Sequence, residues 1–199
     1  MFEYRITEHS SLNHFFDSLK MPEVENWNKI VSNLQGKTVS IEYSDRYLKT
    51  PLGCMLLAKM ISGLKNEADL NLISIKVIIT NIVSTDESDI TVNAIKDFAN
   101  GEKRNLFLKD AISELTGVEP EIQDTGYVEH ERCLTVKADN AELCIRPDAG
   151  IARGWAPFGR DNAECADRDF RENWNMNLKL FNKQHRGAGI LYTVSYKQL

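Results

Sequence analysis

His130 and Arg132 are the residues whose types and spacing most directly fit phosphate chemistry. An imidazole can attack phosphorus as a nucleophile or donate a hydrogen bond to a phosphate oxygen. Arginine presents a planar fork of donors that matches phosphate geometry. Because side chains alternate along a strand, residues two positions apart lie on one face. The pair predicts a phosphate-binding site or part of a phosphodiesterase site, and a purely structural pair is the third interpretation.

Catalysis by this pair is the less favoured interpretation. Phospholipase D-type phosphodiesterases use a histidine nucleophile, a lysine two residues later and an aspartate further along the chain. Arg132 stands at the lysine position here, Lys137 stands at the aspartate position, and the motif occurs once. The sequence therefore predicts binding without turnover. The alternative is a dimeric phosphodiesterase or nuclease that uses His130 as its nucleophile.

Other catalytic and metal-binding patterns are missing from the sequence. There is no phosphate loop of the GxxxxGK[ST] type, and the glycines after position 150 lack the strand-to-helix context of a dinucleotide fingerprint. We therefore expect no cofactor. The four cysteines form no CxxC pair, so we expect no metal site. Because thiols in the cytosol normally stay reduced, we expect buried thiols rather than disulfides at these positions: Cys54, Cys133, Cys144 and Cys165.

Two further clusters offer cationic side chains to a ligand. Arg46 and Lys49 lie between an expected strand and the helix after it, at the sheet edge where ligands collect in α/β proteins. A structural interpretation is also open there, in which Asp45 and Arg46 pair with each other or with neighbouring chain to shape the turn. Arg153 and Arg160 flank aromatic residues in a stretch that could contact lipid headgroups or bases, or close the core under a long loop.

The charge balance limits which partners are possible. The chain has 199 residues and a formal net charge of −5, which excludes a generally basic protein that coats nucleic acid. Seven of the ten arginines follow position 130, where 11 basic residues face 9 acidic ones. The residues after position 130 therefore carry a net charge of about +2, and the residues before them carry about −7. The asymmetry favours an anionic ligand for the last third.

The hydrophobic periodicity predicts an α/β fold in which strand, helix and strand form a crossover unit. We expect a helical extension over residues 1–36 and one α/β domain over residues 37–199. The most apolar segment, residues 70–82, reads as a central strand buried on both faces. The expected helices span residues 11–20 (capped by Ser10 or Ser11), 23–34, 51–64, 91–100 and 103–116. The expected strands span residues 37–43, 70–82, 132–137, 142–146, 176–181 and 190–196.

The sequence gives no sign of membrane insertion or export. The longest nearly apolar run, residues 73–83, is broken by polar residues and is shorter than the roughly 20 residues that a spanning helix needs. Charged residues stand near the N-terminus, where a signal peptide would be apolar. We expect a cytoplasmic protein without a transmembrane segment.

Four short motifs carry a family resemblance over roughly residues 37–196. They are Asp45-Arg46-Tyr47-Leu48, His130-x-Arg132, Asp148-x-Gly150 and Phe181-x-x-x-His185. In this order the chain resembles the phospholipase D-like C-terminal domain of MIT-domain proteins. It is also similar to C-terminal regions of large bacterial helicases of phage-defence type. Residues 1–36 do not fit the three-helix MIT bundle, and residues 146–150 depart from that family's glycine-arginine-glycine turn.

The resemblance implies a phospholipase D-like mixed sheet flanked by helices, a degenerate catalytic motif and a homodimer. The first family implies an anionic lipid ligand and a location at the membrane periphery, whereas the second implies nucleic acid, a larger protein partner and a part in antiviral defence. We therefore predict a non-catalytic module that binds an anionic phosphate ligand, with membrane headgroup and nucleic-acid backbone both open. The expected ligand-binding residues are His130, Arg132, Arg153, Lys49, Arg46, Asp148, Arg160 and His185.

Overall fold

A seven-stranded mixed sheet organises the part of the chain that the structure, a computed structural model, describes. Its strands are β1 (Phe2–Glu8), β2 (Thr38–Asp45), β3 (Asn71–Thr80), β4 (Glu121–Thr125), β5 (Cys133–Ala138), β6 (Ala141–Pro147) and β7 (Ile190–Gln198). The helices are α2 (Trp27–Leu34), α3 (Pro51–Glu67) and α4 (Gly101–Thr116). The described residues are 2–8, 27–49, 51–82, 98, 101–128, 132–147 and 190–199.

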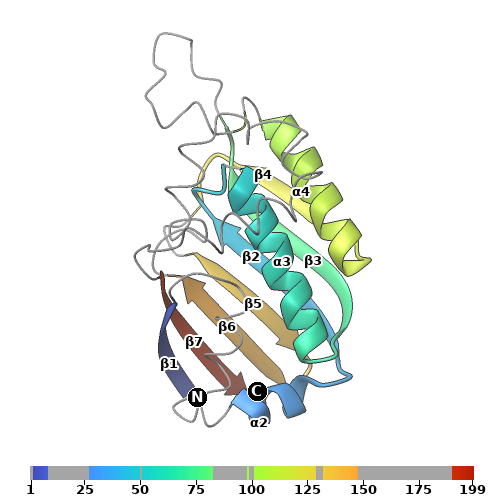
Figure 1. Cartoon of the computed structure of the whole chain (residues 1–199), viewed down its shortest axis with the longest axis vertical. Helices are drawn as coiled ribbons and strands as arrows, with labels where there is room; N and C mark the ends of the chain where they lie inside the picture. The colour runs from blue at the N-terminus through green and yellow to red at the C-terminus, as the bar shows by residue number, and fades with distance from the viewer. Residues whose placement is uncertain are drawn as a thin grey trace, which may run out of the picture.

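The strands follow the order β1-β7-β6-β5-β2-β3-β4 across the sheet. β2, β3 and β4 run parallel, and the other neighbouring pairs are antiparallel. The carboxyl ends of the three parallel strands therefore meet at one edge, where α/β proteins place their ligands. Figure 1 shows α3 and α4 side by side over one face of this parallel part.

Most of the expected elements are confirmed. The α/β class, the parallel β2-α3-β3 unit and the β5-β6 hairpin agree with the sequence analysis. β4 was not expected, because a short strand with mainly exposed residues carries little periodic signal. The expected helix at residues 91–100 falls outside the described residues except Phe98, and the expected strand at 176–181 falls outside them entirely.

The first 36 residues contribute a strand as well as a helix to the described part of the chain. α2 matches the expected helix, but β1 pairs with β7 and brings residues 2–8 into the sheet. Residues 9–26 lie outside the described part of the chain. The division into an extension and a domain stays a prediction.

β3 is buried on one face only, which corrects the expectation of burial on both. Ile75, Val77 and Ile79 are buried, whereas Lys76 and Ile78 on the opposite face are only partly buried. Ile73, at a register shift between β2 and β3, is 62% exposed. The core fills the space between the buried face of the sheet and the helices, which bury Leu57 and Ile112 completely. The high content of β-branched residues in β3 therefore reflects strand preference as well as burial.

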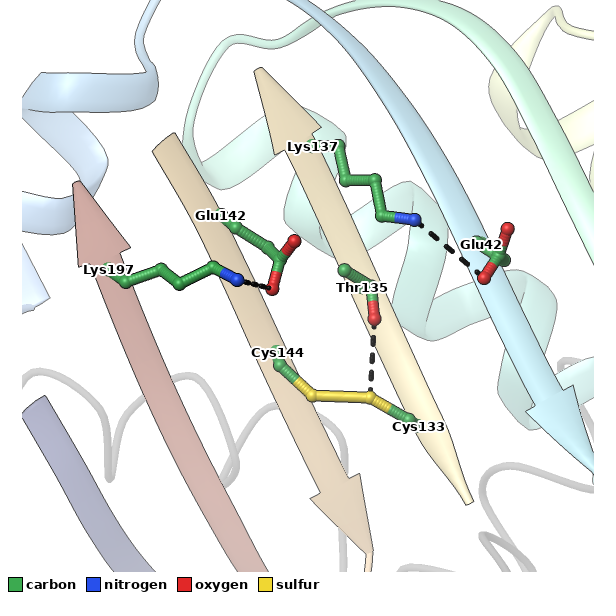
Figure 2. The surroundings of a disulfide bond; sticks show 7 residues. All are labelled: Glu42, Cys133, Thr135, Lys137, Glu142, Cys144 and Lys197. Atoms are coloured by element: carbon green, nitrogen blue, oxygen red, sulfur yellow. Dashed lines mark hydrogen bonds and ion pairs between the residues drawn. A yellow bond between two sulfur atoms is a disulfide. The ribbon is translucent and has the colours of Figure 1, made fainter. Parts of the chain in front are cut away.

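The face opposite the helices carries a row of alternating charges, which we call the charge row. Its residues are Lys197, Glu142, Lys137, Glu42, Lys76 and Glu121, on six successive strands from β7 to β4. The register pairs Lys197 with Glu142, Glu142 with Lys137, Glu42 with Lys76, and Lys76 with Glu121. Glu42 and Lys137 are diagonal neighbours, 3.8 Å apart between Oε1 and Nζ (Figure 2). This pattern fits a sheet face in contact with water.

No helix within the described residues is long and apolar enough to cross a membrane.

Candidate functional site

Asp45 and Arg132 form an ion pair at the carboxyl edge of β2. The antiparallel register pairs Ser44 of β2 with Cys133 of β5, so the next step places Arg132 opposite Asp45. Alternation directs both side chains to the face that the helices cover. The Asp45 Oδ1 and Arg132 Nε atoms are 3.3 Å apart, without the geometry of a hydrogen bond. The strand register is therefore the cause of this pair.

Asp45 is almost fully buried, with 1% of its surface exposed. The Tyr43 hydroxyl donates to its Oδ2 at 2.8 Å, and the Tyr47 backbone N–H donates to its Oδ1 at 2.7 Å. Burial raises the pKa of the Asp45 carboxyl above its usual value, and these two hydrogen bonds and the Arg132 charge oppose that shift. The carboxylate thus fixes the turn after β2 and holds a cation beside it.

Two arginines meet the ring of Tyr47. The guanidinium carbon of Arg132 lies 5.0 Å from the ring centroid, and that of Arg46 lies 5.7 Å from it. Both distances fit cation–π contacts. Tyr47 is 47% exposed and Arg46 is exposed, whereas the Arg132 side chain is 13% exposed. The edge therefore presents an aromatic ring and two positive charges close together, one at the surface and one deeper.

Arg104 of α4 ties the parallel strands together beside this site. Its side chain is buried, and its Nη1 donates to the carbonyl oxygens of Thr80 (2.8 Å) and Leu48 (3.4 Å). Its Nη2 contacts the carboxylate of Asp124 on β4, and the Asn105 amide donates to the same carboxylate at 2.7 Å. Burial lowers the pKa of the guanidinium, and Asp124 opposes this shift. Arg104 thus connects the end of β3, β4 and the loop after β2.

Three of the expected ligand-binding residues belong to the described part of the chain. Arg46 and Arg132 come together at Tyr47. Lys49 is half-buried in the same loop, and its carbonyl accepts the Phe98 N–H at 2.9 Å. The others lie outside the described residues, so their roles stay predictions: His130, Asp148, Arg153, Arg160 and His185.

The structural interpretation of Asp45 is confirmed in part. Its carboxylate does shape the turn, through the backbone N–H of Tyr47, but its described cation partner is Arg132 rather than Arg46. No role was predicted for Tyr47 or Arg104. Extending the buried alternation Val39-Ile41-Tyr43 by two residues would have placed Asp45 on the core face and so revealed the need for a cation. No sequence pattern of this kind indicates that Arg104 is buried.

The cysteines divide into two groups. Cys54 on α3 is a fully buried thiol, as expected, and burial raises its pKa to about 12. The expectation is wrong for Cys133 and Cys144, which form a disulfide between β5 and β6 (Figure 2). Both side chains lie on the face away from the helices, because they alternate with the buried Leu134 and Ile145 along their strands. Cys165 lies outside the described residues.

A hollow of about 300 Å³ lies on the charge-row face. Its charged lining residues are Glu42, Lys76, Glu119, Glu121 and Lys137. Three acidic and two basic side chains give this hollow no excess of positive charge, so its lining does not favour an anion. No group of three or more potential metal ligands occurs within the described residues.

A comparison with known protein families matches residues 10–180 to the C-terminal domain of the DEAD/DEAH box helicase YjiV. The match covers most of the chain. The chain belongs to this family. A comparison with curated proteins found no match. Membership of the YjiV C-terminal family agrees with the expected likeness to a helicase C-terminal region, whereas the likeness to MIT-domain proteins stays a prediction.

Proposed function

We propose that this YjiV-type C-terminal domain binds nucleic acid through its phosphates at the Arg46–Tyr47–Arg132 edge, without catalysing a reaction. The observation that carries the proposal is the joint approach of two guanidinium groups to one exposed tyrosine ring at the carboxyl end of β2. Arginine binds phosphate oxygens through its donor fork, and an exposed aromatic ring next to it can stack on a base. The edge offers both features within one loop and one strand end.

The helicase family supports nucleic acid over a membrane headgroup as the ligand. The domain then acts as a component of a larger nucleic-acid-dependent machine of defence type. Phosphate contacts of this kind supply affinity and position rather than sequence specificity. Binding is therefore independent of sequence and weakens steeply with salt.

The residues that replace the phospholipase D-type motif support binding without turnover. In the phospholipase D-type motif, a lysine at the position of Arg132 holds the phosphate beside the nucleophile. Here the position carries an arginine, and Lys137 stands at the position of the motif's aspartate. We further propose a phospholipase D-like arrangement in a homodimer, in which each copy contributes one such edge. Gel filtration with light scattering measures the mass directly, and a monomer at micromolar concentration would contradict this part.

Fluorescence anisotropy with a labelled single-stranded oligonucleotide and its duplex tests binding. Arg46→Ala is the main variant, because Arg46 is exposed and its loss leaves the core intact. We expect about tenfold weaker binding, or about 1.4 kcal/mol, and a shallower dependence on salt. The matched control is Arg146→Ala, which removes an exposed arginine of β6 on the opposite face of the sheet and should bind as the wild type does.

Parallel assays separate the other ligands and activities. Flotation with vesicles that contain phosphatidylserine or phosphoinositides tests the lipid ligand, and binding to vesicles alone would overturn the proposal. A nuclease and phosphodiesterase screen with and without divalent metal tests turnover. Metal-independent turnover that His130→Ala abolishes would establish the catalytic alternative.

A further inference from the structure

The disulfide between Cys133 and Cys144 links the start of β5, one residue before its ladder with β6 begins, to a residue of β6 that lies inside this ladder (Figure 2). The pairing of these strands runs from Leu134 opposite Ile145 to the turn, so Cys133 lies one residue outside it. The Cα atoms of the two cysteines are 6.5 Å apart, within the usual range for a disulfide. The covalent bond therefore ties Cys133, which has no partner in the β5-β6 ladder, diagonally to Cys144, which pairs with Thr135 within it.

This end of β5 is also the part that positions the candidate site. Cys133 directly follows Arg132 in the chain, and its register partner on β2 is Ser44, which directly precedes Asp45. Cys133 pairs with β2 through the backbone ladder. Its described connection to β6 is the disulfide, because the β5-β6 ladder ends at Leu134. Strand ends without a partner on one side open more readily than strand centres. Loss of the bond would let the start of β5 separate from β6 and move Arg132 away from Asp45.

We propose that Cys133 and Cys144 form a reversible thiol–disulfide exchange site, and that its oxidised state holds Arg132 in place at Asp45. The exchange partner is a low-molecular-weight thiol and its disulfide, such as glutathione. The consequence for ligand binding rests on the proposed function, whereas the exchange and its effect on β5 do not.

Exposure and hydrogen bonding assign different roles to the two sulfurs. Cys133 is partly exposed, while Cys144 is 6% exposed. The Thr135 hydroxyl lies 3.2 Å from the Cys133 Sγ and can donate to it (Figure 2). Such a donor stabilises a thiolate, which is the nucleophile in exchange. Cys133 is therefore the sulfur that meets the small molecule, and Cys144 is the one that resolves the mixed disulfide.

The oxidation proceeds in two balanced displacements. The Cys133 thiolate attacks the small disulfide, forms a mixed disulfide and releases one small thiolate. The Cys144 thiolate then attacks the Cys133 sulfur and releases the second. Two electrons pass from the protein thiols to the small disulfide, and the two protons that the protein thiols lose are taken up by the two released thiolates. Reduction is the reverse sequence and begins with attack of a small thiolate on Cys133.

Thiol trapping on the full chain tests the exchange. The protein is equilibrated with mixtures of reduced and oxidised glutathione, blocked with a maleimide and analysed as peptides by mass spectrometry. We expect Cys133 and Cys144 to change state together over this range, while Cys54 stays unmodified in the native protein because it is buried with a pKa of about 12. A pair that stays in one state across the whole range would overturn the proposal.

Hydrogen exchange tests the effect on β5 without any ligand. We expect reduction to speed exchange at least tenfold at the start of β5, near Leu134, and to leave Val136 and β3 unchanged. Cys144→Ser should show the fast exchange in both buffers, whereas Cys165→Ser should respond as the wild type does. Equal hydrogen-exchange rates in the oxidised and reduced protein would overturn the proposal that the disulfide holds Arg132 in place.

Oligonucleotide binding in the same two buffers connects the switch to the site. We expect binding to weaken severalfold on reduction, and Cys144→Ser to match the reduced protein in both buffers. An oligonucleotide affinity that is the same in both buffers would overturn the proposal that the disulfide affects the binding site. If exchange at β5 responds but neither state binds any oligonucleotide, the proposed function fails while the exchange site stands.

Discussion

Asp45 and Arg132 stand opposite each other one step beyond the last paired residues of β2 and β5, with 3.3 Å between Oδ1 and Nε. The position follows from strand register, so the pair forms wherever the β2-β5 ladder forms. Because Asp45 is buried, its carboxylate needs a compensating charge. Arg132 thus has a structural role at Asp45 and a proposed ligand role at Tyr47, and the two roles are separable by experiment.

Loss of Arg132 alone should cost more stability than loss of both partners. Arg132→Met leaves the Asp45 carboxylate buried without its cation, and we expect a loss of about 2–4 kcal/mol in the free energy of unfolding. Asp45→Asn combined with Arg132→Met should recover most of this loss, because no buried charge remains. Urea unfolding of the four proteins of this double-mutant cycle measures the coupling. Additive losses would show that the pair is not coupled.

The Asp45 carboxyl should make the protein less stable as pH rises. Its pKa is raised in the folded state, so the folded protein holds a proton more tightly than the unfolded chain does. Stability from this group is therefore greatest below the ordinary aspartate pKa of about 4 and falls as pH rises through the folded pKa. Urea unfolding of wild type and Asp45→Asn from acidic to neutral pH checks the sign. As pH rises, the free energy of unfolding of the wild type should fall relative to that of the Asn variant. A relative rise would contradict a raised pKa for Asp45.

Sequence patterns predicted the elements whose burial is periodic and missed what depends on pairing between strands. The alternation in β2, the apolar and β-branched content of β3 and the Thr50-Pro51 start of α3 were sufficient for the parallel unit. β4 escaped because its residues are mostly exposed, and β1 because its role comes from pairing with β7. In the site, phosphate chemistry pointed to Arg132 and Arg46, but the position of Asp45 opposite Arg132 required the β2-β5 register. Arg104 could not be found, because a lone arginine in a helix gives no sign that it is buried.

Arg104 should be among the costliest residues to replace in the described part of the chain. Arg104→Met removes donors to two backbone carbonyls and leaves Asp124 without its guanidinium, and we expect a loss of at least about 3 kcal/mol. Arg104→Lys should retain only part of the stability that Arg104→Met loses, because an ammonium group cannot reach all the acceptors that the guanidinium contacts. The control is Lys109→Met on the same helix, an exposed residue paired with Glu119 at 2.5 Å, whose loss should cost much less stability than Arg104→Met. Chemical unfolding monitored by circular dichroism gives all three values, and equal losses for Arg104→Met and Lys109→Met would contradict the network.

The charge row should make the sheet sensitive to the sign of Glu42. Glu42 faces Lys76 directly and lies 3.8 Å from Lys137, so Glu42→Lys would place three positive charges on neighbouring strands. Like charges opposite each other destabilise a sheet, and we expect a loss of about 1–2 kcal/mol at low salt. Because these side chains are partly exposed, about 1 M salt should screen most of this loss. Glu42→Gln removes the attraction without adding repulsion and should lose roughly half as much. Thermal unfolding of the three proteins at low and high salt measures these effects, and a Glu42→Lys loss that salt leaves unchanged would show that packing rather than charge is responsible.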